Sequence, residues 1–161
     1  MISKNRQHEL DNLFLSFPAG QERGPYYAFL NQRLEEDPVA GGEDGVYLIE
    51  LGYQKKNVFF TCLYASLLDP NEEDDIYRPY FKEGKNKEKC IGLLKWAAEE
   101  NGPLWALEDL LDLYWNDSAD YLSYLKTAGK WLKLYQERAD PKEATTHILL
   151  EAEDAKKLRL F

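Results

Sequence analysis

The chain has 161 residues, a hydrophobic fraction of 44% and an aromatic fraction of 14%, which predicts one domain over residues 1–161 with an apolar core and excludes a wholly disordered chain. Its formal net charge of −9 at pH 7 repels phosphate and anionic lipid, so we expect no nucleic acid and no membrane as partner. Asp11 and Asn12 interrupt the apolar run that could serve as a leader, so a cytoplasmic location is expected.

The first third of the chain predicts two amphipathic helices followed by a loop. Residues 5–17 place apolar side chains at helical spacing. Gly24-Pro25 favours the start of a second helix, because proline in the first helical position loses no hydrogen bond. Residues 35–45 (EEDPVAGGEDG) hold five acids, one proline and three glycines, and this composition predicts a loop that acts as a hinge.

The apolar stretch that follows leaves two structures open. The β-branched and aromatic content of residues 46–60 would suit a small β-hairpin. Asn57 could instead cap a buried helix over residues 58–68, which we favour because Ala65 and the residues after it do not alternate. A short helix is predicted over residues 76–83, although Pro79 would strain it.

From residue 86 onward the periodicity predicts four helices with short connections. Asn101-Gly102-Pro103 ends the first and begins the second, which runs to Trp115. The third extends towards Ala139, and Asp140-Pro141-Lys142-Glu143 resembles a capping box that begins the last. Short connections favour antiparallel neighbours. The predicted fold class is therefore mainly α, an antiparallel helical bundle or short helical-repeat array, with the possible hairpin at 46–60.

Residues 86–135 resemble a Sel1-like helical repeat. CIGLLKWAA at 90–98 and YLSYLKTAG at 121–129 align without gaps. The positions that match the family's two helices are Lys89, Cys90, Leu93, Leu94, Ala97, Ala98 and Glu99, and then Ala106, Leu110 and Tyr114. The family prefers Ala at Cys90, and Gly at Leu111 and near Asp117. The resemblance implies a curved helical scaffold for protein contacts, without chemistry of its own.

No motif of an enzyme, cofactor or metal site is recognised, and no cofactor is expected. Cys62 and Cys90 lack a metal-binding spacing and are predicted to be buried thiols. His147 stands four residues from both Glu143 and Glu151, so a helix would stack the three side chains on one face. An enzyme or metal site that uses His147 is one alternative, and a solvated helix face is the interpretation we favour.

The leading hypothesis is a non-catalytic acidic module that binds another, basic protein. Such a module could be an immunity or antitoxin protein that neutralises a basic toxin such as a nuclease. Acidic rims steer cationic partners, and Tyr and Trp anchor interfaces. The predicted partner-binding residues are Glu72, Glu73, Asp74, Asp75, Tyr114 and Trp115. A Sel1-like adaptor that binds a peptide is the alternative from the family resemblance.

Overall fold

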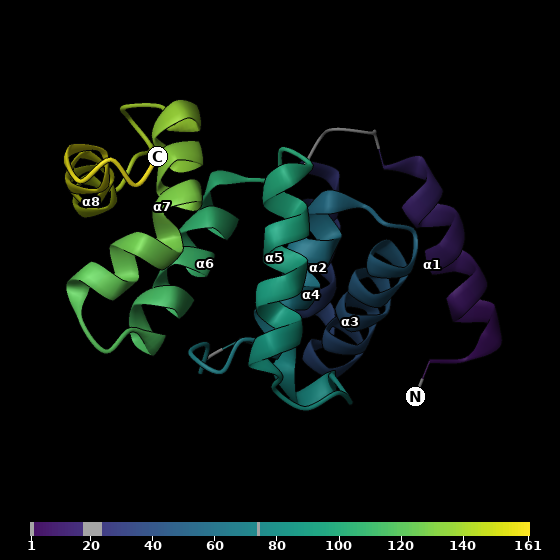
Figure 1. Ribbon diagram of the computed structural model, residues 1–161. Coiled ribbons are helices and arrows are strands. Elements are labelled where there is room, and N and C mark those ends of the chain that lie inside the picture. Colours follow the sequence, from purple (N-terminus) through teal and green to yellow (C-terminus); the bar gives the residue numbers. More distant parts are fainter. Residues whose placement is uncertain (1, 18–23, 74) are drawn as a thin grey trace. The chain divides into compact units, whose positions relative to one another are not determined.

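The computed structural model (Figure 1) describes residues 2–17, 24–73 and 75–161. These residues form eight α-helices and one short 3-10 helix, and no strand is found among them. The elements are α1 (Lys4–Ser16), α2 (Gly24–Glu36), α3 (Pro38–Gln54), α4 (Val58–Leu68), η1 (Arg78–Tyr80), α5 (Lys87–Glu99), α6 (Leu104–Asp117), α7 (Tyr121–Arg138) and α8 (Thr146–Lys157). The mainly α fold class is confirmed.

The chain divides into two compact units, Met1–Leu93 and Leu94–Phe161, with the boundary inside α5. We call them the N-terminal unit and the C-terminal unit and describe each by itself. The prediction of a single domain over residues 1–161 stays a prediction. No helix in the described part of the chain is long and apolar enough to cross a bilayer.

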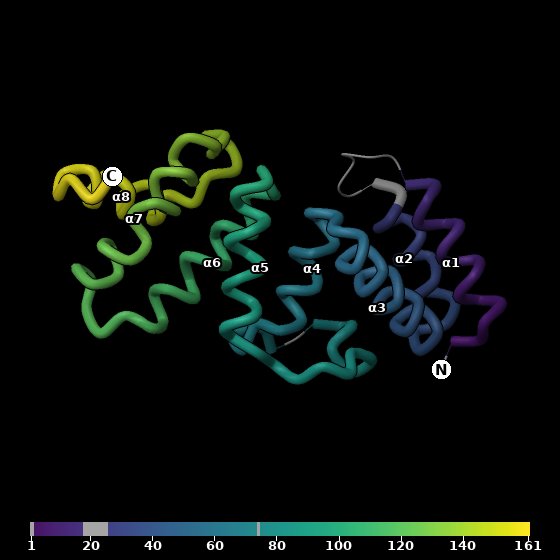
Figure 2. The backbone as a smooth tube through the Cα atoms, turned by 45° about the vertical axis from the view of Figure 1, so that its right-hand side comes forward, coloured from purple at the N-terminus to yellow at the C-terminus, as the bar shows by residue number. Residues whose placement is uncertain are grey.

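Helix α3 lies at the centre of the N-terminal unit, where it packs against α1, α2, α4 and η1. Figure 2 shows α3 running between α2 and α4. A helix that contacts neighbours on several sides must bury residues around most of its circumference. The buried residues of α3 are Gly41, Gly42, Asp44, Gly45, Val46, Leu48, Ile49 and Gly52.

The predicted loop at 35–45 and the possible hairpin at 46–60 are both wrong. Helix α3 takes up most of these residues, and the ends of the two ranges fall in α2 and α4. Asp37 caps the helix by accepting hydrogen bonds from the backbone N–H groups of Val39 and Ala40, each at 3.2 Å. Pro38 then occupies the first turn, where proline is tolerated. The composition of residues 35–45 predicts that the proline and the glycines interrupt a helix. In α3 the proline instead follows the cap in the first turn, and the glycines permit close packing.

Three glycines of α3 permit close approach of neighbouring groups. A Cβ on Gly41 would lie 2.8 Å from the backbone nitrogen of Leu34 in α2. A Cβ on Gly42 would meet the Tyr80 ring at 2.2 Å, and one on Gly45 would meet the Tyr77 ring at 2.3 Å. The glycines therefore seat both α2 and the segment around η1 directly on α3. The predicted helix at 76–83 is reduced to η1, which begins at the residue before Pro79.

A buried carboxylate joins three helices of the N-terminal unit. The Asp44 side chain on α3 is 3% exposed, and its Oδ2 accepts from Arg6 Nη2 of α1 at 2.6 Å and from Arg33 Nε of α2 at 3.1 Å. The hydrogen bond to Asp44 raises the pKa of the Arg6 guanidinium. Two cations compensate the one buried charge, as a buried carboxylate requires.

The helix predicted at 58–68 is confirmed as α4. The Asn57 side chain caps it by accepting from the backbone N–H of Phe60 at 3.1 Å. Phe60 packs its ring against Tyr26 of α2, with the centroids 4.7 Å apart and the planes nearly perpendicular. Both predicted thiols, Cys62 and Cys90, are buried.

The C-terminal unit packs α6 against α7 and α7 against α8. Tyr135 of α7 donates its hydroxyl to Glu108 of α6 at 2.9 Å and accepts from the Thr145 backbone N–H at 2.6 Å. Tyr124 donates to Glu151 of α8 at 2.9 Å. Tyrosine–carboxylate hydrogen bonds thus fix α7 to both of its neighbours.

The predicted capping box at 140–143 is wrong. The Asp140 side chain accepts a hydrogen bond from the backbone N–H of Lys142 at 2.9 Å. The Asp140 backbone carbonyl accepts one from the backbone N–H of Glu143 at 2.9 Å, so these residues form a separate turn. Helix α8 begins later, at Thr146. The side chain that could cap a helix at Asp140 closes this local turn instead.

Candidate functional site

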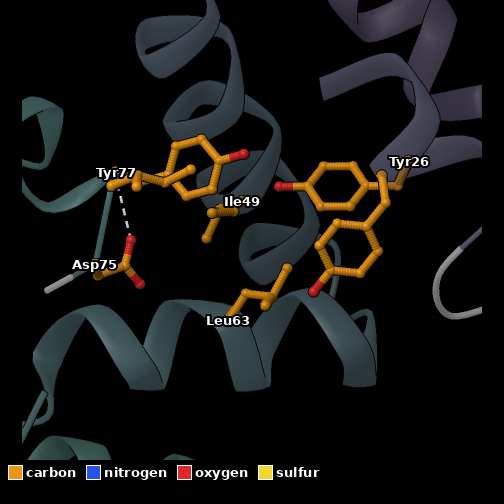
Figure 3. Close-up of a pocket in the computed structure, with 7 residues that line it drawn as sticks. Tyr26, Ile49, Leu63, Asp75 and Tyr77 are labelled. Carbon is orange, nitrogen blue, oxygen red and sulfur yellow. Dashed lines mark hydrogen bonds between the residues drawn. The ribbon is translucent and has the colours of Figure 1, made fainter. Parts of the chain in front are cut away.

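A pocket in the N-terminal unit combines phenol groups, aliphatic side chains and one carboxylate. It has a volume of about 260 Å³ and is lined by Tyr26, Tyr27, Ile49, Leu63, Asp75, Ile76 and Tyr77. We call it the tyrosine pocket (Figure 3). Helices α2, α3 and α4 supply one wall each, and the segment before η1 supplies the rest.

Tyr26 carries a buried hydroxyl that has no hydrogen-bond partner. The residue is 3% exposed, and its hydroxyl is one of the few buried polar atoms in the described chain that lack a partner. In Figure 3 this hydroxyl points across the pocket towards that of Tyr77. Burial raises the pKa of Tyr26 well above its ordinary value, so the phenol stays neutral and can both donate and accept. An unpaired buried hydroxyl costs stability and marks a place where a ligand could supply the partner.

Asp75 is the charged group of the pocket. Its Oδ1 accepts from the backbone N–H of Tyr77 at 2.8 Å, which fixes the carboxylate beside the Tyr77 ring. A carboxylate has about four lone-pair positions, so Asp75 retains acceptor capacity beyond this bond. No residue with a positive charge occurs among the described residues that line the pocket. The lining therefore favours a ligand that donates hydrogen bonds or carries positive charge.

The raised pKa values of Tyr77 and Tyr47 predict that the fold loses stability at alkaline pH. Burial raises the pKa of Tyr77 to about 12, and the charge of Asp75 adds to the effect. Burial also raises the pKa of Tyr47 to about 12, and its hydroxyl donates to Asp11 at 2.6 Å. A group whose pKa is raised by folding stabilises the fold below its unfolded pKa, and this contribution disappears as the pH passes the folded pKa.

We therefore expect the free energy of unfolding to fall between pH 10 and pH 12, as measured by urea denaturation across that range. The double variant Tyr47→Phe/Tyr77→Phe should show a shallower decline. An equal decline in both proteins would contradict this assignment.

Three of the four predicted acidic contact residues are described by the structure. Glu72 and Glu73 are exposed, and Asp75 is half-buried at the tyrosine pocket. Lys85 donates to the Glu72 backbone carbonyl at 2.6 Å, which helps hold the segment in place. Asp74 lies outside the described residues. Only Asp75 of the predicted set is therefore shown to line the pocket.

The two predicted aromatic contact residues lie on α6 in the C-terminal unit. Trp115 is 48% exposed, and its ring meets that of Tyr124 edge to face at 5.0 Å. Tyr114 lies under the ammonium group of Lys95, 5.4 Å from the ring centroid. These residues belong to a different unit from the acidic ones, so their joint role stays a prediction.

The arrangement predicted around His147 is wrong in part. Glu143 lies in the turn before α8, so it cannot share a face of that helix with His147. Glu151 does lie on α8, where its carboxylate accepts from Tyr124. Within the described ranges, no group of three or more His, Cys, Asp or Glu side chains could hold a metal ion.

Most residues of the tyrosine pocket were not identified as site residues from the sequence. Tyr26 lies in the predicted second helix, and Ile49 lies in the stretch at 46–60 for which the sequence allows two structures. The available signal was weak: two adjacent tyrosines at 26–27, and Tyr77 two positions after an acid. Neither pattern specifies a pocket, because the walls come together only through helix packing.

A comparison with protein-family models, with curated proteins and with solved structures finds no match. The resemblance to Sel1-like repeats accordingly stays a prediction.

Proposed function

We propose that this chain is a non-catalytic module that captures a basic protein partner, in the way that an immunity or antitoxin protein would neutralise a basic toxin. The observation that carries the proposal is the position of Asp75. It ends a run of acids whose described members Glu72 and Glu73 are exposed, and it lines a pocket with an unpaired buried hydroxyl. Exposed acids beside a pocket without basic lining favour a cationic partner.

Capture would take place in two stages. The net charge of −9 attracts a cationic protein over a distance of about one Debye length, ~8 Å at physiological ionic strength. Exposed charges such as Glu72 and Glu73 then act mainly on the association rate, because surface charges contribute little to the lifetime of a complex. Residues that become buried, here those of the tyrosine pocket, determine how long the complex lasts.

Charge reversal at Glu72 and Glu73 tests the steering step. We expect the double variant Glu72→Lys/Glu73→Lys to bind a lysine-rich peptide with an association rate roughly tenfold lower at low salt. Its rate should also depend less on salt concentration than that of the unmodified chain. Both positions are exposed, so the fold should tolerate the change. Stopped-flow measurement of association at several salt concentrations checks the prediction.

The matched control is the double variant Glu100→Lys/Glu137→Lys. Both glutamates are exposed in the C-terminal unit, and the variant changes the net charge by the same amount. A steering role of the 72–75 segment predicts a smaller loss of rate in this control. Equal losses would show that only net charge matters and would remove the segment from the proposal.

A Sel1-like adaptor is a second proposal. It is supported by the successive packing of α6 on α7 and of α7 on α8, the order that stacked helical repeats follow. In such repeats the groove between helix pairs holds a peptide, so peptide-induced changes would map to the C-terminal unit and not to the tyrosine pocket.

A further inference from the structure

Building on the proposed function, we infer that the tyrosine pocket receives the ammonium end of a lysine side chain supplied by the basic partner. The pocket presents three phenol rings, three aliphatic side chains and one carboxylate. Aromatic rings attract cations through their negative faces, and an ammonium group removed from water needs an anion and hydrogen-bond acceptors. Asp75 supplies the anion.

The unpaired hydroxyl of Tyr26 is an independent observation that points to the same ligand. The hydroxyl is buried, lines the pocket and has no partner. The Tyr26 oxygen can accept a hydrogen bond from an ammonium group, which has three donors in rotatable positions. A donor to Tyr26 would satisfy the hydroxyl that the free protein leaves unpaired, while Asp75 in the same pocket lining supplies the compensating charge.

The geometry of Asp75 favours ammonium over guanidinium. A guanidinium group is held best by two parallel bonds to both oxygens of a carboxylate. The Tyr77 backbone N–H at 2.8 Å occupies one lone pair of Asp75 Oδ1, which leaves fewer approaches for a two-oxygen pairing than for a contact with Oδ2 alone. Ammonium is a compact point charge that one oxygen can bind.

The size of the pocket fits one side chain. A volume of about 260 Å³ is smaller than the roughly 300–1,000 Å³ typical of sites for drug-sized ligands. Ile49, Leu63 and Ile76 would contact the methylene groups of a lysine, whose stem is apolar along its length. The aliphatic and charged parts of the side chain therefore both find matching surfaces.

Binding of single amino-acid analogues tests the ligand class. We would titrate the full chain with Nα-acetyl-lysine methylamide and follow the methyl NMR signals of Ile49, Leu63 and Ile76. Saturable shifts with the lysine analogue are expected, with at least tenfold weaker binding of the norleucine analogue, which lacks the charge. The arginine analogue should also bind more weakly. Equal binding of norleucine, tighter binding of arginine, or no shift with lysine would overturn the inference.

Two substitutions test the named groups. Asp75→Asn keeps a side-chain oxygen that can accept from Tyr77 but removes the charge, and should weaken lysine-analogue binding about tenfold. Tyr26→Phe keeps the ring against Phe60 and should weaken binding several-fold while leaving the melting temperature equal or higher, because it removes an unpaired hydroxyl. A purely structural role of Tyr26 would lower the melting temperature, and that result without weaker binding would contradict the inference.

Glu35→Gln is the matched control, because it removes one charge from an exposed residue of the N-terminal unit that lies outside the pocket lining and has no assigned role in binding. It should change lysine-analogue binding less than twofold.

The inference and the proposed function can fail separately. If a lysine-rich peptide binds in a salt-dependent manner but Asp75→Asn and Tyr26→Phe bind it as tightly as the unmodified chain, the inference is wrong and the proposed function stands. If the peptide does not bind at all, the proposed function is wrong.

Discussion

Replacing Asp44 with alanine is expected to lower the free energy of unfolding by about 3 kcal/mol, because the variant leaves two guanidinium groups without their shared anion. The side chains of Arg6 and Arg33 are only 29% and 26% exposed, so water can replace the lost carboxylate only in part. The substitution also removes the hydrogen bonds that join α1 and α2 to α3. Urea denaturation would measure this loss of stability. The slope of the unfolding free energy against urea concentration should be the same in the variant and in the unmodified chain.

The control variants for Asp44 are Glu9→Ala and Glu36→Ala. These glutamates pair with the same two arginines, but their side chains are 62% and 52% exposed. Exposed ion pairs contribute roughly 0–1 kcal/mol, so each control should lose less than about 1 kcal/mol. If Asp44→Ala lost no more than the controls, the buried carboxylate would not be a stabilising link.

Gly41→Ala is expected to destabilise the chain by about 2 kcal/mol, although alanine is the better helix former. The added Cβ would lie 2.8 Å from the Leu34 backbone nitrogen and 2.9 Å from the carbonyl carbon of Arg33, and backbone atoms cannot rotate away. Helices α2 and α3 would have to separate, which also displaces Tyr26 and Tyr27 from the tyrosine pocket. Thermal unfolding followed by circular dichroism would detect the loss.

Gly92→Ala is the matched control for Gly41→Ala. Gly92 lies inside α5, and an added Cβ would meet nothing within 4 Å. The same substitution should therefore stabilise the chain by about 1 kcal/mol, the difference in helix propensity. Effects of the same sign at both positions would contradict the close approach of α2 to α3.

The sequence predicted those helices whose end signals are local. Asn57 before α4 and Pro25 in the first turn of α2 are examples, because a cap or a first-turn proline acts within one helical turn. It failed at α3, where the same local signals were present at Asp37 and Pro38 but three glycines suggested a loop. What keeps Gly41 and Gly45 in a helix is contact with α2 and with Tyr77, and no window of sequence displays those contacts.

Among the residues that line the tyrosine pocket, the sequence predicted only the charged one, Asp75, as a contact residue. Asp75 was identified because it stands in an acidic run, whereas Tyr26, Ile49 and Leu63 are ordinary apolar-face residues in the sequence. Their meeting at one pocket depends on how α2, α3 and α4 pack. Whether a buried hydroxyl finds a hydrogen-bond partner likewise depends on the folded structure. The unpaired hydroxyl of Tyr26 could therefore not be predicted from composition or spacing.

The structure also changes how the acidity of the chain is understood. Several carboxylates accept hydrogen bonds from tyrosine hydroxyls and therefore serve the fold as well as the surface charge. These pairs are Asp11–Tyr47, Glu83–Tyr64, Glu108–Tyr135, Glu151–Tyr124 and Asp154–Tyr121. Tyr26 differs from these tyrosines because its buried hydroxyl has no such acceptor, which makes the pocket a place where a partner could complete the same kind of bond.

Methyl NMR of the full chain during titration with a lysine-rich peptide tests the central claim most directly. If the acidic run leads a basic partner to the tyrosine pocket, the signals of Ile49 and Ile76 shift to saturation. Asp75→Asn then raises the peptide concentration at half-saturation about tenfold, whereas Glu35→Gln leaves it unchanged. Saturable binding that moves signals only in the C-terminal unit would contradict the account, as would pocket shifts that saturate at the same peptide concentration in Asp75→Asn as in the unmodified chain.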